Sequence, residues 1–160
     1  MTAPYYSLID KASNALALYL RSELPEQSRI IYPAKRALEK EAPCIICAAE
    51  TGTPELAYSG RYVIDCTISV CTLAVSSAPE SQDGSDEAVA ASSELVATVF
   101  DAFHFGDHGE GLPLANALTE QVEDFTCHIV RHESISQEFD DNVWRDIMRI
   151  KIVCSPADLT

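Results

Sequence analysis

The segment "PCIICAA" at 43–49 contains Cys44 and Cys47, three residues apart. This C-x-x-C spacing is one that redox or metal-binding chemistry could use. A redox-active C-x-x-C pair usually opens a helix, because the helix N-terminus lowers the thiol pKa. Here the pair lies inside an apolar, β-branched run that predicts a strand, and on a strand residues three apart point to opposite faces. The chain has no second C-x-x-C to complete a four-thiolate zinc site. We therefore interpret both thiols as packing residues.

The other four cysteines also predict packing. Cys66 and Cys71 lie five apart on one expected strand and face opposite ways, while Cys127 and Cys154 fall on the apolar faces of two later strands. Residues 1–15 lack the basic start and apolar run of a secretion signal. We therefore expect reduced thiols in a cytosol rather than a disulfide framework.

Two histidine pairs have a spacing of four, which suits a metal site on a helix. The first pair, His104 and His108 in "HFGDH", has a glycine inside it and no catalytic glutamate. The second pair, His128 and His132 in "HIVRH", lies on an expected strand, where residues four apart stand roughly 13 Å from each other. Neither pair predicts a metal site.

Two glycine-containing stretches complete the search for reactive motifs. "GDHGEG" at 106–111 lacks the lysine and the following helix of a phosphate-binding loop. "QDGSDE" at 82–87 lacks the ligand spacing and closing glutamate of a calcium loop. The sequence thus offers no catalytic constellation, and it predicts a protein that is not an enzyme and holds no cofactor or metal.

The amino-acid composition of the chain limits the kinds of molecule that we expect it to bind. The chain has 160 residues, with 25 acidic and 11 basic side chains and a formal charge of −14. Such a balance argues against a domain that grips nucleic acid, because phosphate contacts need clustered Lys and Arg. No apolar run approaches the length of a membrane span. We expect no membrane partner and no specific nucleic acid partner.

Hydrophobic periodicity predicts the elements that position these residues. A period of 3.6 predicts two helices, and short apolar or alternating runs predict strands. The expected fold is α+β, with a single mixed or antiparallel β-sheet of about five strands and two α-helices packed on one face, in a single domain over 1–160. The expected helices are 5–23 and 88–104, the strands are 29–33, 43–49, 61–75, 121–132 and 143–154, and loops are expected over 76–87 and 106–119.

The last expected strand carries a basic strip in an otherwise acidic chain. Arg145, Arg149 and Lys151 alternate with apolar residues and so fall on the face opposite the core. One interpretation is a solvated sheet face with salt bridges. The other is a subunit interface that meets an acidic surface on a neighbouring copy, and heterologous contacts of that kind close into rings.

Several segments together resemble the tail terminator, or tail completion, proteins of long-tailed bacteriophages. They are the helix that ends at "LPEQSRIIYP", the strands "APCIICAA" and "GRYVIDCTISVCTLAV", the helix "AVAASSELVATVFDAF" and the closing "NVWRDIMRIKIVC". The resemblance covers about residues 4–155 and rests on element order, spacing and strand pattern. No functional residue is carried across individually.

The resemblance implies a structural virion protein. It implies an α+β chain that assembles as a ring homo-oligomer, a hexamer, which caps the finished tail tube and joins it to the head connector. The implied partners are other copies of the chain, the tail tube protein and the connector or neck proteins, in a virion tail or neck assembled in the host cytoplasm. DNA would pass through the ring, and acidic lumen walls would avoid holding it.

Two alternatives stay open. One is a neck, or head–tail adaptor, protein of the connector. The other, from a different class, is a small cytosolic enzyme or ligand-binding domain, for which we would expect a cleft with convergent titratable groups.

Overall fold

A single five-stranded sheet organises the chain. The computed structural model describes residues 4–33, 42–54, 60–73, 82–103, 112–140 and 143–156, with the backbone alone described at 4–7, 82–89, 112–113 and 140. The elements are α1 (Pro4–Glu23), the 3-10 helix η1 (Pro25–Ile30), β1 (Ile31–Pro33), β2 (Cys44–Pro54), β3 (Tyr62–Leu73), α2 (Gln82–Asp101), α4 (Leu112–Gln121), β4 (Thr126–Asp140) and β5 (Val143–Ser155).

The strand order is β1-β2-β3-β5-β4. Strand β1 runs parallel to β2, and every other neighbouring pair is antiparallel. The predicted α+β fold with one mixed sheet is therefore confirmed.

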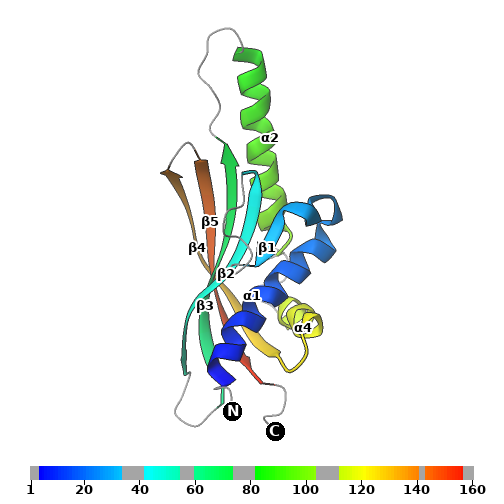
Figure 1. Ribbon diagram of the computed structural model, residues 1–160, viewed down its shortest axis with the longest axis vertical. Coiled ribbons are helices and arrows are strands. Elements are labelled where there is room, and N and C mark those ends of the chain that lie inside the picture. The colour runs from blue at the N-terminus through cyan, green and yellow to red at the C-terminus, as the bar shows by residue number, and fades with distance from the viewer. Residues whose placement is uncertain are drawn as a thin grey trace.

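The helices lie on one side of the sheet (Figure 1). Helix α1 packs on β2, and α4 packs on β4. Helix α2 is tied to β3 where the Ser92 hydroxyl donates a hydrogen bond to Thr72 Oγ1 at 2.9 Å. The opposite face of the sheet is not covered by any of the described helices (Figure 1).

The helix count differs from the expectation. Two helices were expected, whereas the described residues contain α1, α2 and α4 as well as η1. Helix α4 begins inside the segment expected to be a loop over 106–119, and it forms because Leu114 and Leu118 bury one side of a short helix against the core. Helix α2 begins at Gln82, inside the loop expected over 76–87. The rest of both expected loops lies outside the described residues.

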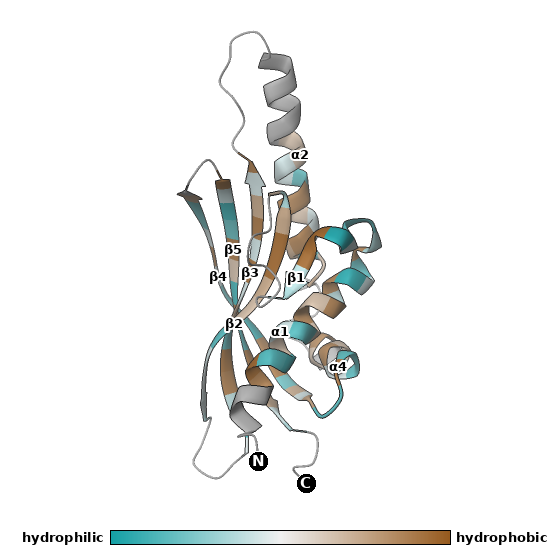
Figure 2. Ribbon diagram, in the orientation of Figure 1, coloured by the Kyte–Doolittle hydropathy of each residue, from teal (hydrophilic) through white to brown (hydrophobic). Residues whose placement is uncertain are grey.

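The core lies between the helices and the sheet. The amphipathic pattern of α1 places Leu8, Leu16 and Leu20 in it, each at most 1% exposed. Turns of α1 alternate between hydrophilic and hydrophobic colours along its length (Figure 2). From the sheet, Ile68 and Ile150 join the same hydrophobic cluster. Truncating one such leucine to alanine costs about 2–5 kcal/mol.

The β4–β5 hairpin extends past this core. Trp144 lies on the same face of β5 as Met148 and Ile150, as the strand pattern predicts, but its side chain is 39% exposed. It packs against Phe139 of β4, with ring centroids 4.7 Å apart. The alternation of apolar residues along β5 predicts that Trp144 belongs to the core, and this prediction is wrong, because Trp144 lies one residue from the start of β5 beside the exposed Phe139.

Candidate functional site

The face of the sheet turned away from the helices, which we call the open face, carries the predicted basic strip. Met148 and Ile150 of β5 belong to the core. Side chains alternate along a strand, so Arg145, Arg149 and Lys151 point the other way. The structure thus brings the three predicted residues to one face, as expected. Their role at a subunit interface stays a prediction.

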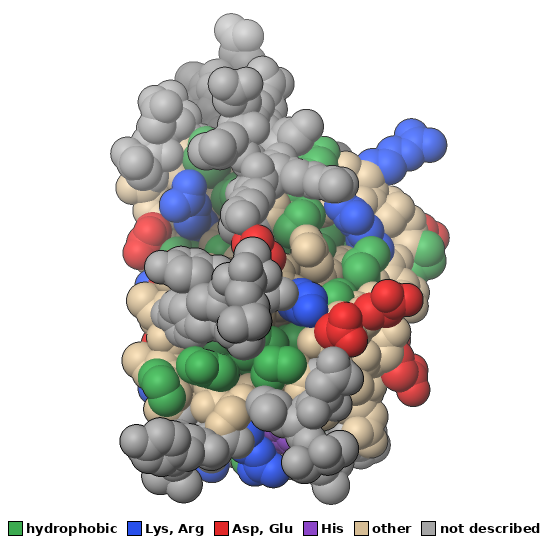
Figure 3. Space-filling view, turned by 60° about the horizontal axis from the view of Figure 1, so that its bottom comes forward, with side chains coloured by type: hydrophobic (Ala, Val, Ile, Leu, Met, Phe, Trp, Pro, Cys, Tyr) green, Lys and Arg blue, Asp and Glu red, His purple; other side chains and the backbone are tan. Residues whose placement is uncertain are grey.

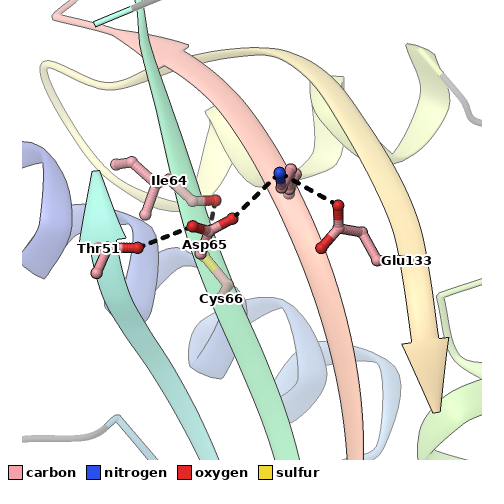
Figure 4. A network of polar contacts seen from close by, with 6 residues as sticks. Thr51, Ile64, Asp65, Cys66 and Glu133 are labelled. Carbon is pink, nitrogen blue, oxygen red and sulfur yellow. Dashed lines mark hydrogen bonds and ion pairs between the residues drawn. The ribbon is translucent and has the colours of Figure 1, made fainter. Parts of the chain in front are cut away.

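Lys151 lies in a polar network that crosses four strands of the open face (Figure 4). Its Nζ lies 3.3 Å from Glu133 Oε1 of β4 and 3.8 Å from Asp65 Oδ1 of β3. Thr51 of β2 completes the row, since its hydroxyl donates to Asp65 Oδ2 at 2.8 Å. Half-exposed ion pairs of this kind contribute only about 0.2–1 kcal/mol each. The charge of Lys151 is nevertheless compensated within the chain.

Arg149 and Arg145 have weaker internal partners. Arg149 is half-buried, and its Nη1 donates a hydrogen bond to the neutral hydroxyl of Ser136 at 2.7 Å. Arg145 is exposed and lies directly between Cys71 of β3 and Glu138 of β4 in the strand register. Arg149, whose side-chain partner is neutral, is therefore the cation of the strip that is better placed to meet an outside anion, whereas Arg145 has Cys71 and the Glu138 carboxylate beside it.

The thiols divide between the two faces of the sheet. Cys44 and Cys47 point to opposite faces, as the strand prediction requires, because Cys47 is in the core and Cys44 lies opposite Cys71 on the open face. All six cysteines are free. Burial raises the pKa of Cys47 to about 12 and that of Cys66 well above its ordinary value.

Strand register creates two cysteine pairs that sequence reasoning missed. Cys44 of β2 is the register partner of Cys71 of β3, on the open face. Cys127 of β4 is the partner of Cys154 of β5, on the core face. No spacing along the chain indicates either pair, because each depends on which residues two strands place opposite each other.

The two pairs differ in their electrostatic surroundings. A hydrogen bond from the Cys44 thiol, and then the Arg145 guanidinium, lower the pKa of Cys71 below its ordinary value, against the effect of burial. The pKa of Cys44 rises because of the same hydrogen bond and of burial. On the core face, burial raises the pKa values of Cys127 and Cys154 to about 12. The thiolate is thus favoured at one position, Cys71.

The histidines do not converge on a metal. A ring nitrogen of His128 lies 2.7 Å from Ser155 Oγ, while His132 is the register partner of Ile150. The pair at 104 and 108 lies outside the described residues. Across the part of the chain that the structure describes, no three His, Cys, Asp or Glu side chains form a group that could hold a metal ion.

A depression on the helix side offers little chemistry. It has a volume of about 380 Å³ and lies between α1, β1 and the end of α4. Arg21 and Glu123 are the charged residues of its lining, which also contains Asn14, Ala17, Leu18, Pro33, Gln121 and Val122. The Arg21 guanidinium donates to the Ile31 carbonyl at 2.6 and 3.1 Å, so it holds α1 to β1.

Searches of protein-family models and of curated proteins found no match to this chain. None of the helices in the described segments combines the length and apolar character needed to cross a membrane.

Proposed function

We propose that this protein is a structural component of a phage tail, a tail terminator that works as a closed ring of identical subunits. The observation that carries the proposal is the contrast between the two sides of the molecule. The open face of the sheet gathers cations, and the helix side presents exposed carboxylates. The resemblance of element order and strand pattern to tail terminators supplies the particular role.

The cations of the open face come from two neighbouring strands. Arg131 of β4 is the register partner of Lys151 of β5, and Arg145 and Arg149 continue the row along β5. Four of the 11 basic residues of the chain therefore lie on this face. Asp65, Glu133 and Glu138 lie among these cations and balance most of their charge, so in a chain with a formal charge of −14 this is a face that does not repel an acidic surface.

The helix side supplies a surface of the opposite sign. Glu94 and Asp101 of α2 are exposed and lie seven residues apart, so they share one side of that helix. Glu120 and Glu123, at the end of α4, are exposed as well. Acidic side chains also gather along one flank of the molecule in Figure 3.

Two different surfaces that complement each other favour a head-to-tail contact. When the open face of one copy meets the helix side of the next, each subunit keeps one surface for the following subunit. Contacts of this kind close into a ring when the rotation between copies permits it. Charge complementarity would steer this association and fix its register more than it would add affinity.

The mass of the purified protein, alone and with tail tubes, tests the proposal. A ring of six chains of 17.5 kDa has a mass of about 105 kDa. We expect that species in native mass spectrometry, and we expect the ring to bind the end of tail tubes built from the tube protein of the same source. A protein that stays monomeric at high concentration and never binds tubes would refute the proposal. Binding to isolated head connectors but not to tubes would instead favour a neck adaptor.

A further inference from the structure

The open face holds a second feature, which does not depend on the proposed function. Cys44 and Cys71 are directly opposite each other on antiparallel strands. Directly opposite residues have Cα atoms about 4.5–5.5 Å apart, and disulfides span Cα separations of about 4.4–6.8 Å. The Cα separation of the pair therefore suits a disulfide, and the Cβ atoms, about 4.5–5.5 Å apart in directly opposite residues, need to approach by only about 1 Å.

We propose that Cys44 and Cys71 are a redox-active thiol pair, which hydrogen peroxide converts to a cross-strand disulfide, with Arg145 as the positioning residue beside Cys71. The thiolate is the nucleophilic form of cysteine, and cationic neighbours favour it. Arg145 supplies that neighbour from β5, as the register partner of Cys71 on its other side. Cys44, Cys71 and Arg145 thus form one row across three strands.

The reaction has two steps. The Cys71 thiolate attacks one oxygen of hydrogen peroxide, the O–O bond breaks, and a sulfenic acid and hydroxide form. The Cys44 thiol then attacks the sulfenic sulfur, the S–O bond breaks, and the S–S bond forms with release of water. The thiol proton leaves with the departing oxygen. In total, one thiolate and one thiol are oxidised, and one peroxide is reduced to one water and one hydroxide, which takes up the proton that Cys71 had released to the solvent.

Size restricts the oxidant. Each of the two thiols is only 3% exposed, so a bulky reagent is excluded. Arg145, however, is exposed, and none of the described helices covers this face. Hydrogen peroxide, a molecule of two oxygens, needs only a small displacement of such side chains to reach Cys71.

Cys127 and Cys154 provide an internal control. They too are directly opposite on antiparallel strands, so their backbone geometry also permits a disulfide. They lie under the helices in the core, where burial holds the pKa of each thiol at about 12. Geometry alone therefore predicts two disulfides, whereas the proposal predicts one.

The first experiment treats the reduced full-length chain with hydrogen peroxide at pH 7 and maps disulfides by mass spectrometry of non-reduced peptides. We expect a peptide pair linked through Cys44 and Cys71, while Cys127 and Cys154 stay reduced. This measurement needs no substitution. Absence of the link, or its appearance at both pairs at equal rates, would overturn the proposal.

The second experiment separates the roles of the three residues. In Cys44→Ser we expect a sulfenic acid at Cys71, which dimedone traps when the peroxide-treated chain is unfolded in its presence, and in Cys71→Ser we expect none at Cys44. Arg145→Gln should slow disulfide formation up to about tenfold at pH 5, because below the Cys71 pKa of about 6 each unit of thiol pKa changes the thiolate fraction about tenfold.

The matched control is Arg29→Gln, which removes the same charge at an exposed position of η1, away from both thiols. Its oxidation rate should equal that of the wild type. The pH profile of the rate should shift upward in Arg145→Gln alone, an effect that a merely structural role would not produce. Equal slowing in both variants, or an unshifted profile in Arg145→Gln, would refute the role of Arg145. All rates are measured on monomer isolated by size exclusion at high salt, so that they do not depend on ring assembly.

Discussion

Charge reversal of Arg149 is the sharpest test of the proposed ring. An exposed ion pair contributes about 0.2–1 kcal/mol, and replacing attraction by repulsion changes each contact by roughly 1 kcal/mol. In a ring of six such contacts the changes sum to roughly 6 kcal/mol, about four powers of ten in the equilibrium for ring closure. Arg149→Glu should therefore leave a folded monomer that does not close rings. The internal loss is small, because Arg149 gives up one hydrogen bond to Ser136.

The matched control is Arg29→Glu. Arg29 is exposed on η1, on the helix side, so this variant changes the net charge of the chain by the same amount away from the open face. Native mass spectrometry at low and high salt compares the two variants with the wild type, and circular dichroism verifies folding. We expect rings in Arg29→Glu, monomers in Arg149→Glu, and weaker wild-type rings at high salt, where screening is strong. Normal rings in both variants would show that the strip is only a solvated face.

Three further predictions concern stability. Tyr19→Phe should cost about 1–3 kcal/mol in chemical denaturation, because it leaves the Ala102 carbonyl without the 2.6 Å hydrogen bond from the tyrosine hydroxyl; no loss would show that water replaces it. Burial raises the folded-state pKa of Cys47 and of Cys154 to about 12, so their contribution to stability is complete below the unfolded pKa of about 8.5 and falls as pH rises toward 12. A melting temperature that stays constant from about pH 8 to 11 would contradict this sign. The proposed cross-strand disulfide closes a loop of 28 residues (71 − 44 + 1) and should stabilise the oxidised chain by about 3–4 kcal/mol, measured as a higher denaturation midpoint that a reductant reverses.

Strand β5 is an element whose two faces could be predicted from the sequence alone. Its period-two pattern placed Met148 and Ile150 on one face and Arg149 and Lys151 on the other, and the structure has the same arrangement. That pattern is strong because one face is buried by helices, so a slip of one residue would expose the apolar set. Helix α1 was predictable for a related reason, since its apolar stripe is long.

The features that were missed depend on tertiary contacts. Helix α4 has ten residues, too few for a stable isolated helix, and its helicity depends on packing of Leu114 and Leu118. The exposure of Trp144 follows from its position near the start of β5 beside the exposed Phe139, which the period-two pattern does not encode. The pairing of Cys44 with Cys71 depends on the register between β2 and β3. A register shift between Ala49 and Thr51 means that this pairing cannot be found by counting equal numbers of residues back along each strand from their connection.

Arg145 takes part in both proposals, the ring and the thiol pair. The charge of its neighbour Cys71 determines how oxidation would affect association between copies. A Cys71 thiolate in the reduced chain, as proposed above, would offset the guanidinium, so that Arg145 offers less positive charge to a carboxylate on another subunit. A disulfide between Cys44 and Cys71 carries no charge, and its formation therefore returns the full charge of Arg145 to the open face. Lys151 cannot respond in this way, because Asp65 and Glu133 flank it in either redox state. If both proposals hold, oxidation should strengthen association between copies at low salt, and this gain should vanish in Cys71→Ser. Equal association of the reduced and oxidised chains would mean that the thiol pair and the basic strip act independently, although they share a face of the sheet.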